Sequence, residues 1–439
     1  MAESAIETVR VIKSAFGRKL VFASKFSTRK CIFQESPYFY ILCNKKRGLF
    51  CDFCLKQCSD LQRCSSCKYV RYCSRQCQKS DWSRCHKQDC KTLKRIHPRV
   101  PPDLAQLLSQ IIRKQNKPPP WDDEDHFPTS LDQLESHHDK LSDARKDHFQ
   151  SLLFVLNQCM EGAVLPEPSS LLKMFGAIIC NSFSICDNDL NGIAVGIYLR
   201  ASMLNHSCDP NCVVVFDGRK LQLRTIKDVK EGEECTISYV DIMEPIRERQ
   251  AELKERYHFI CNCVKCVDEI KALELDNGLD ERVEGLQKSL ETIQDAEKSQ
   301  DWSKVLLLCE PYLKPMNSSS QGLPANHHLL VKLRDKAFDA CIDTQAWEKA
   351  AMVGQLNTDP YRHHYGPYHP SLGIHLLKMG KLLLYLERLQ EARKYLTEAQ
   401  RDLGVTHGSQ HALMITLVLE LLCMKVRLTI FIKITSLSS

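Results

Sequence analysis

The chain has 439 residues, of which 43% are hydrophobic and 26% are charged, and its formal net charge at pH 7 is +6. This composition is typical of globular domains, and it excludes collagen-like and wholly disordered chains. At roughly 100 to 200 residues per domain, the length predicts two to four domains.

The distribution of apolar residues and cysteines predicts the compartment. No run of about 18 uncharged apolar residues occurs, so we expect no membrane span and no membrane partner. The segment from Met1 to Lys13 lacks the uninterrupted apolar core of a signal peptide. We therefore expect a soluble chain in a reducing compartment, where the 23 cysteines form no disulfides and their clusters bind metal.

The first motif in chain order is a cysteine-rich segment, since nine of the 23 cysteines fall between Cys51 and Cys90. Short-spaced pairs provide eight ligands, which suit two tetrahedral zinc ions. A segment of about 40 residues buries little core, so zinc would supply its folding free energy. The pairs are Cys51 and Cys54, Cys64 and Cys67, Cys73 and Cys77, and His86 and Cys90.

These interleaved pairs resemble the MYND finger. The resemblance implies one ion held by Cys51, Cys54, Cys73 and Cys77, and a second held by Cys64, Cys67, His86 and Cys90. It also implies proline-rich peptides or DNA as partners of the finger. Residues 51–95 carry eleven Lys and Arg against four Asp and Glu, a net charge of +7. This segment either meets nucleic acid or an acidic partner, or it is a zinc module whose basic surface is simply solvated.

Two helices are predicted after the finger. Leu104 to Lys114 has apolar residues at helical spacing, and Lys117 to Pro120 interrupts the pattern. The next helix is predicted from Asp143 to Met160.

Three polar motifs then follow a stretch, Gly192 to Leu204, that predicts a strand and a short helix. Asn205 to Asn211 is rich in turn formers and contains Cys208. Gly232 to Tyr239 predicts a turn and then a strand that ends in a tyrosine. Tyr257 to Cys266 carries two aromatic residues and three cysteines.

In this order the three motifs resemble those of the SET-domain protein-lysine methyltransferases. Together with the finger, they make the chain similar to the SET and MYND domain-containing proteins over nearly its whole length. The resemblance implies an α+β fold, with a β-rich SET domain at 8–240 split by the finger at 51–90. The first SET strands would lie before residue 50. A zinc-binding post-SET segment at 241–268 and an all-α, tetratricopeptide-like lobe at 270–425 would follow.

The resemblance also implies an activity: methyl transfer from S-adenosylmethionine to lysine in histone and non-histone proteins. The cell compartments expected are cytoplasm and nucleus, and the expected assembly is a monomer. Tyr239 is the catalytic residue by this resemblance, and we expect Phe183, Tyr239 and Tyr257 to wall an aromatic channel for the lysine. Such a channel would lower the lysine pKa by desolvation.

The remaining implied residues bind the cofactor or a third zinc ion. The cofactor-binding residues would be Gly17, Arg18, Lys19, His137, Asn181, Asn205, His206, Tyr239 and Phe259. The third zinc ion would be held by Cys208, Cys261, Cys263 and Cys266, giving three ions in all.

Two of these positions depart from the family pattern. The family has a Gly-x-Gly-Leu turn beside the cofactor, and this chain has Lys19 in place of the second glycine. Lys19 either pairs with the cofactor carboxylate or obstructs the site. His137 stands where the family has an asparagine that contacts the cofactor. If these changes prevent cofactor binding, the alternative function is a non-catalytic adaptor that binds proteins through its finger and helical lobe.

From about residue 270 the pattern is helical. Gln300 to Trp302 and Gln345 to Trp347 begin two similar helices 45 residues apart. This period fits stacked helix pairs, although a plain helical bundle is the alternative. The family resemblance favours the repeat, with the lobe facing the SET half and narrowing the substrate cleft. The tail at 426–439 has β-branched residues in alternation, so it is either a foreign end or a continuation of the last helix against its propensity.

Overall fold

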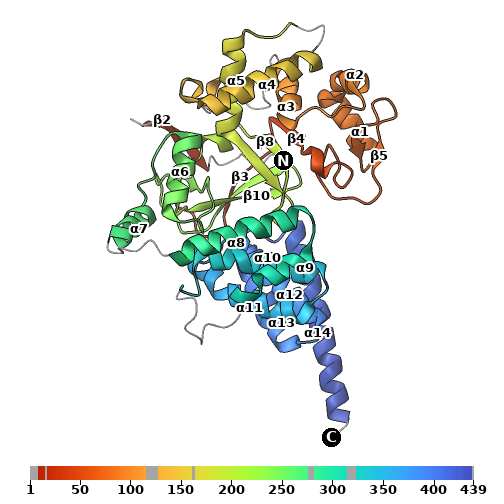
Figure 1. Ribbon diagram of the computed structural model, residues 1–439, viewed down its shortest axis with the longest axis vertical. Helices are drawn as coiled ribbons and strands as arrows, with labels where there is room; N and C mark the ends of the chain where they lie inside the picture. The colour runs from red at the N-terminus through yellow and green to blue at the C-terminus, as the bar shows by residue number, and fades with distance from the viewer. Residues whose placement is uncertain are drawn as a thin grey trace.

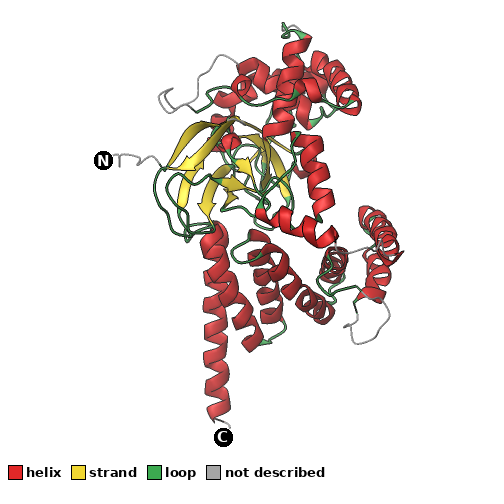
Figure 2. Ribbon diagram, turned by 90° about the vertical axis from the view of Figure 1, so that its left-hand side faces the viewer, coloured by secondary structure: helices red, strands yellow, loops and turns green. Residues whose placement is uncertain are grey.

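The computed structural model describes residues 8–14, 17–114, 127–160, 164–274, 281–313 and 323–437. Short strands form the centre of the molecule, helices and the cysteine-rich finger lie at one end, and an all-helical lobe lies at the other (Figures 1 and 2). The α+β fold predicted from the sequence is confirmed. All 23 cysteines are free of disulfides.

The central strands bring distant parts of the chain together. Within these small sheets, β3 pairs with β11 in the order β10-β11-β3, and β4 pairs with β8 in the order β4-β8-β7. The only parallel pair among the described strands joins β9 to β12. The strands are β1 (Val9–Ser14), β2 (Gly17–Phe22), β3 (Cys31–Glu35), β4 (Phe39–Leu42), β7 (Ser182–Cys186), β8 (Gly192–Ile197), β9 (Asn205–His206), β10 (Cys212–Asp217), β11 (Lys220–Thr225) and β12 (Thr236–Ile237).

Apolar side chains on these strands form one core. Tyr40 and Tyr198 are fully buried in it, and their hydroxyls donate to the carbonyls of Phe53 and Arg219. Buried phenols need such acceptors, because an unpaired hydroxyl in an apolar core is costly. The core thereby also ties the SET strands to the first residues of the finger.

The cysteine-rich finger lies between β4 and α3 (Asp103–Lys114). It contains β5 (Gln62–Arg63), β6 (Arg71–Tyr72), α1 (Arg75–Asp81) and α2 (Lys87–Ile96). Ser74 caps α1 by accepting a hydrogen bond from the Cys77 backbone N–H at 3.1 Å. The finger is therefore an insertion with the spacing of zinc ligands, and the chain continues from it into α3, a helix of the core.

Four further helices complete this half: α4 (Asp143–Cys159), α5 (Pro168–Asn181), α6 (Ile246–Tyr257) and α7 (Val264–Glu274). The predicted helices at 104–114 and 143–160 thus coincide with α3 and α4. The expected break at 117–120 lies outside the described residues. One expectation was too long: β12 covers two residues only, and Tyr239 lies two positions beyond it.

The lobe is helical throughout its described residues. Two of its helices pack closely because α12 presents glycine to α13: a Cβ at Gly380 would lie 2.5 Å from Leu396 Cδ2. The helices are α8 (Glu281–Lys298), α9 (Trp302–Cys309), α10 (His328–Asp343), α11 (Trp347–Tyr365), α12 (Pro370–Tyr385), α13 (Leu389–Thr406) and α14 (Ala412–Leu437).

The tail continues the last helix, and its β propensity is overridden. Once α14 is nucleated on the lobe, each further residue adds a backbone hydrogen bond at little cost. The second half of α14 projects away from the lobe (Figure 1). Within the described residues, no helix has the length and apolar character needed to cross a bilayer.

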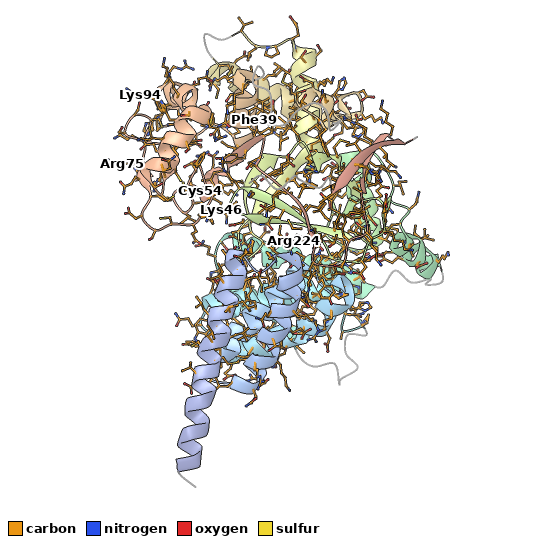
Figure 3. The ribbon with its side chains drawn as sticks, turned by 180° about the vertical axis from the view of Figure 1, so that it is seen from behind. Phe39, Lys46, Cys54, Arg75, Lys94 and Arg224 are labelled. Atoms are coloured by element: carbon orange, nitrogen blue, oxygen red, sulfur yellow. The ribbon has the colours of Figure 1, made fainter. Side chains whose placement is uncertain are left out.

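Two junctions hold the lobe against the SET half. At one, Arg224 of β11 donates to the Val405 carbonyl at 3.0 Å, and the close approach of Gly408 leaves no room for a Cβ beside its guanidinium (Figure 3). At the other, Tyr365 of α11 donates to Asp241 at 3.2 Å. Because Asp241 lies two residues after Tyr239, the second junction brings the lobe to the edge of the predicted active site.

Candidate active site and metal centres

Three groups of thiol and imidazole ligands lie in separate clusters. Within each group, the four possible ligand atoms lie within 4.8 Å of one another. All twelve sequence-predicted ligands are brought together in the predicted sets, whereas Cys58 and Cys85 lie outside them. The groups are Cys51, Cys54, Cys73 and Cys77; Cys64, Cys67, His86 and Cys90; and Cys208, Cys261, Cys263 and Cys266.

The spacing of these atoms fits zinc. A Zn–S bond of about 2.3 Å implies a separation of about 3.8 Å between two sulfurs of a tetrahedral site. The Sγ atoms of Cys54 and Cys73 are 3.7 Å apart, and those of Cys64 and Cys90 are 3.8 Å apart. A disulfide would require about 2.05 Å. The three clusters can therefore hold three zinc ions, and the chemistry of the donor set fits them.

The third cluster is positioned by α6. The Gln250 side chain forms two hydrogen bonds with the Cys261 backbone: it accepts from the N–H at 2.8 Å and donates to the carbonyl at 2.7 Å. The buried Arg249 guanidinium donates toward Cys266 Sγ at 3.8 Å and pairs with Glu269. Four thiolates on one Zn²⁺ carry a net charge of −2, so a buried cation beside them lowers the cost of burying that charge.

Aromatic side chains gather where this cluster meets the SET strands. The Tyr239 ring lies 4.7 Å from that of Tyr257 and 6.4 Å from that of Phe259, measured between ring centroids. His206 lies 5.3 Å from Tyr239 and 5.9 Å from Phe259. The zinc-binding segment therefore carries two aromatic residues onto the motif at Asn205 and His206, as the sequence predicted.

Tyr239 is half-buried, and desolvation raises the pKa of its hydroxyl well above the usual range. It donates a hydrogen bond to the Leu204 carbonyl. The group is thus a neutral phenol with its proton committed to the backbone. Its oxygen lone pairs are the part that can receive a hydrogen bond from a substrate.

His206 has its ring orientation fixed by two contacts. Its Nδ1 accepts from the Tyr239 backbone N–H at 3.0 Å, and its Nε2 lies 3.2 Å from Cys208 Sγ. The histidine therefore links the predicted catalytic tyrosine to the third zinc cluster.

Asn205 and Lys19 meet at a carboxylate that the sequence analysis did not single out. Asn205 Nδ2 donates to one oxygen of Glu234 at 2.8 Å, and Lys19 Nζ lies 3.5 Å from the other. The Lys19 and Glu234 side chains are about a third exposed. Glu234 belongs to the Gly232–Tyr239 motif. Its partners, Lys19 on β2 and Asn205 on β9, are far from it in the sequence, so the motif alone does not indicate them.

Asn181 is the last residue of α5, and His137 lies in the loop before α4. Asn181 Nδ2 donates to the Glu135 and Ala177 carbonyls, both at 2.8 Å. His137 adopts a left-handed backbone conformation with φ of +43°, and its ring lies 4.9 Å from that of His258. Burial lowers the pKa of His137. Both residues are therefore constrained by backbone contacts.

Gly17 and Arg18 begin β2. Gly17 has φ of +110°, and a Cβ built there would meet no atom within 4 Å, so there is open space beside Gly17. Arg18 donates to the Gln133 carbonyl. The space beside Gly17, the amide and charged groups at Asn205, and the aromatic edge at Phe259 fit a cofactor with a charged amino-acid end and an aromatic base.

Phe183 occupies a different place from the other predicted channel residues. Its ring packs edge-on against Tyr198 at 5.7 Å, and no aromatic contact among the described residues joins it to Tyr239. The adjacent Ser182 instead lines a cavity of about 410 Å³ that the sequence did not predict. Phe183 thus packs against the central core and is not among the residues that line the cavity.

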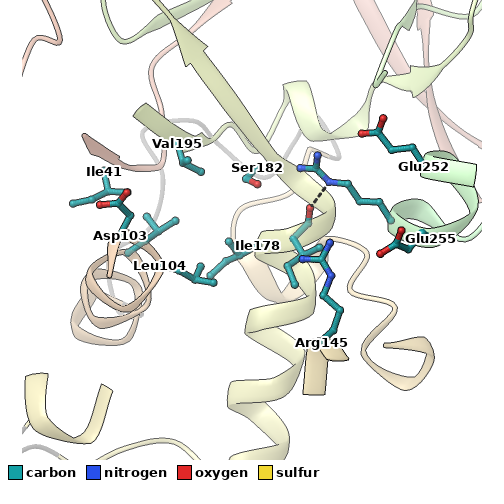
Figure 4. A pocket seen from close by; sticks show the side chains of 12 residues that line it. Ile41, Asp103, Leu104, Arg145, Ile178, Ser182, Val195, Glu252 and Glu255 are labelled. Carbon is teal, nitrogen blue, oxygen red and sulfur yellow. Dashed lines mark hydrogen bonds between the residues drawn. The ribbon is translucent and has the colours of Figure 1, made fainter. Parts of the chain in front are cut away.

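The cavity has an apolar floor and a charged rim (Figure 4). Arg256, which precedes Tyr257, closes one side by donating to the Ile179 carbonyl at 3.3 Å. The floor consists of Ile41, Leu104, Leu107, Ile178, Ile179 and Val195, and the rim includes Asp103, Arg145, Glu252, Glu255 and Arg256. The cavity therefore adjoins the predicted lysine channel from the side of α6.

The chain is similar to known methyltransferases over most of its length. The SET domain family model matches residues 18–240. The human protein "Histone-lysine N-methyltransferase SMYD3" is 36% identical over 395 residues, covering 89% of this chain and 91% of the relative. Human "N-lysine methyltransferase SMYD2" is 29% identical over 408 residues, with 90% and 93% covered.

A solved structure, the SET domain of LSMT bound to lysine and AdoHcy, matches with a TM-score of 0.37 and 14% identity, covering 94% of this chain and 89% of the other. The family itself is shown by the sequence relatives. With its SET match and its similarity to SMYD3, the chain belongs to the SET and MYND family of protein-lysine methyltransferases.

Proposed function

We propose that the chain methylates lysine side chains of histone and non-histone proteins, with Tyr239 as the catalytic residue. The observation that carries the proposal is the half-buried Tyr239, whose hydroxyl donates to the Leu204 carbonyl and whose ring is flanked by those of Tyr257 and Phe259. S-adenosylmethionine, when bound, supplies the methyl group that the amine attacks. The chain's own residues would have to deliver that amine neutral, dry and aligned.

The aromatic walls would favour the neutral amine. Burial between rings disfavours an ammonium ion, so the lysine pKa falls as the side chain enters. The Tyr239 oxygen, whose proton is directed to Leu204, can then accept a hydrogen bond from an amine N–H. That bond turns the nitrogen lone pair toward the cofactor side of the site.

The cofactor would be held by residues that come from four segments. Asn205 and His206 border the charged end and Phe259 offers the aromatic surface, whereas Asn181, His137, Gly17, Arg18 and Lys19 complete the predicted set. His137 and Asn181 are anchored on the 135–137 segment, which supports a cofactor wall there despite the departure from the family pattern.

Two features support basic protein segments as substrates. Acidic side chains outnumber basic ones near the predicted channel: Asp241 is bound by the lobe, and the cavity rim has Asp103, Glu252 and Glu255 against Arg145 and Arg256. The apolar floor of the 410 Å³ cavity would take an apolar side chain near the target lysine. A substrate lysine flanked by an apolar residue and other basic residues fits both features.

The finger is proposed as a docking module for DNA or proline-rich peptides. Lys87, Lys91 and Lys94 are exposed on α2 at spacings that place them along one face. Lys94 and Arg75 lie on the outer side of the finger (Figure 3). Such a stripe supports binding to phosphates, whereas the partly exposed Trp82 offers a surface for proline rings.

We further propose that the protein works as a monomer in cytoplasm and nucleus.

The decisive experiment for the activity incubates the purified chain with S-adenosylmethionine, core histones and a cytosolic lysate, and identifies methyllysine by mass spectrometry. Methyllysine on defined peptides is the expected result. If no protein in the panel gains methyl groups and the chain binds no S-adenosylmethionine, the adaptor function replaces this proposal.

A further inference from the structure

Lys19 and Glu234 form an ion pair beside Asn205, at the cofactor end of the proposed active site. The two Glu234 oxygens have different partners: one accepts from Asn205 Nδ2 at 2.8 Å, and the other lies 3.5 Å from Lys19 Nζ. The lysine side chain therefore leans along the strand toward Glu234. The sequence left open whether Lys19 pairs with the cofactor carboxylate or obstructs the site, and it did not identify Glu234 as the partner of Lys19.

The backbone fixes the positions of all three side chains. Phe22 N–H donates to the Glu233 carbonyl and Cys235 N–H donates to the Leu20 carbonyl, both at 2.9 Å, so β2 is tied to the segment that carries Glu234. On the other side, β12 pairs with β9, where Thr236 lies opposite Asn205. The ion pair is thus set by strand pairing, unlike a chance encounter of two long side chains on a surface.

The ion pair between Lys19 and Glu234 remains accessible to a ligand from the side of Gly17. Lys19 and Glu234 are 30% and 31% exposed, and the space beside Gly17 is empty of atoms within 4 Å of a built Cβ. A cation and an anion held this close present the charge pattern opposite to that of an α-amino-acid group, which has a carboxylate and an ammonium on one carbon. Charge-assisted hydrogen bonds to such a group are stronger than neutral ones.

We propose that Lys19 and Glu234 together recognise the zwitterionic amino-acid end of the cofactor, with Lys19 binding its carboxylate and Glu234 binding its ammonium. The inference rests on the proposed function. Without ligand the two side chains neutralise each other, so neither charge is left unpaired. Lys19 then acts as a specificity residue for a carboxylate-bearing ligand at a position where the family has glycine.

The test is calorimetric binding of S-adenosylmethionine and of its decarboxylated analogue, which retains the amine. Lys19→Met should weaken binding of S-adenosylmethionine about tenfold and change binding of the analogue less than twofold. Lys19→Arg should keep most of the affinity, because it keeps the charge. Glu234→Gln, which retains an acceptor for Asn205, should weaken binding of both ligands about fivefold.

A neighbouring pair provides the matched control. Arg10 and Glu231 form an exposed ion pair whose charged atoms are 3.2 Å apart. Neither residue belongs to the predicted cofactor site, so Glu231→Gln should leave both affinities unchanged. Zinc content and thermal midpoint report whether each variant is folded, and the Lys19 variants decide alone if Glu234→Gln unfolds. The inference is overturned if Lys19→Met binds S-adenosylmethionine more tightly than the wild type does, or if Lys19→Met loses the same affinity for both ligands. If the wild type binds neither ligand, the proposed function fails, and the inference fails with it.

Discussion

At the scale of single residues, hydrogen bonds to the backbone between 199 and 204 shape the active site. The Leu204 carbonyl accepts a hydrogen bond from the Tyr239 hydroxyl. The backbone N–H groups of Arg200 and Ala201 donate to the buried Glu35 carboxyl at 3.0 and 2.9 Å. Both contacts join positions far apart in the chain. They determine where the Asn205 motif begins.

The Tyr239→Phe variant should lose activity without losing its fold. The substitution removes one hydroxyl and almost no volume, so zinc content should stay constant. If the phenol oxygen aligns the amine, kcat should fall at least tenfold, which corresponds to about 1.4 kcal/mol in the barrier. Steady-state kinetics with a methylated-peptide readout measures this change. Unaltered kcat would remove Tyr239 from the catalytic role.

Glu35 should make stability depend on pH. Burial raises the pKa of Glu35 from 4.5 to about 7, although the two backbone N–H donors and Arg200 oppose that shift. Because the folded pKa lies above the unfolded one, the group's contribution is greatest below pH 4.5 and is lost as pH rises through 7. The loss amounts to about 3 kcal/mol.

Glu35→Gln lacks this titration. The stability of wild type relative to Glu35→Gln should therefore decrease between pH 5 and pH 8, as measured by urea unfolding of the two proteins in parallel. A difference that is constant across this range would show that Glu35 does not titrate on folding.

The sequence predicted residues where chemistry imposes a spacing. All twelve predicted metal ligands fall into their predicted clusters: short spacing identified the ligand pairs, and the family resemblance implied which pairs share an ion. Glu234, Glu35 and the Leu204 carbonyl were not identified as site groups. Their partners lie on other strands or in the backbone, and no local pattern signals a carbonyl as an acceptor.

At the scale of elements, the post-SET segment depends on metal for its position. It contains α6 and the start of α7, and its buried cluster has only Val240, Ile246 and Leu253 besides cysteines, so the third metal cluster helps α6 to hold Tyr257 and Phe259 in place. Zinc binding and the aromatic wall are thereby coupled.

The Cys261→Ser variant should lower the zinc content from about three ions per chain to about two, because four thiolates converge there and the finger is independent. Methylation should be lost with the third ion. Cys58→Ser, in the finger but outside both clusters, should keep three ions. Elemental analysis of protein purified without chelators measures the stoichiometry, and a native value of two or fewer would contradict the assignment.

The α2 helix should give DNA binding a steep salt dependence. Each neutralised phosphate releases counterions, so affinity through Lys87, Lys91, Lys94 and Arg95 should fall strongly as salt rises. Replacing these four residues with Gln should weaken DNA retention while peptide methylation remains. Fluorescence anisotropy across a salt series measures the slope. Failure to bind DNA even at low salt would leave protein docking as the finger's only proposed role.

Predicted helices were accurate where apolar periodicity was strong, as in α3 and α4. The strands were less predictable, because each is short and gains stability from partners far along the chain. The tail shows the opposite conflict: α14 extends through a β-branched sequence because the preceding helix propagates into it.

At the scale of the whole molecule, contacts in two regions of the described chain attach the lobe, and the sequence did not reveal them. Arg224 reaches the carbonyl end of α13, where the helix dipole favours a cation, and His411 donates to the Phe216 carbonyl at 2.9 Å. The Tyr365–Asp241 contact lies on the side of the active site. An all-helical lobe was predictable from periodicity, but docking contacts between distant single residues have no local pattern.

The Arg224→Met variant should loosen the lobe. It leaves the Val405 and Arg29 carbonyls without their donor, a cost of about 1 to 3 kcal/mol that comes mainly from the buried Val405 carbonyl. We expect faster hydrogen exchange at β11 and at the end of α13, with zinc content unchanged. Arg393→Met, an exposed cation on the same helix, is the control. Equal exchange in both variants would mean that Arg224 does not hold the junction.

The insertion of the finger also sets the order in which the protein is built during synthesis. Strand β3 leaves the ribosome early, but its partner β11 follows about 190 residues later, a wait of roughly 10 to 40 s at 5 to 20 residues per second. The finger completes its ligand sets within that interval. A newborn chain should therefore carry two zinc ions before its central sheet exists, and it should depend on metal supply earlier than on any core packing.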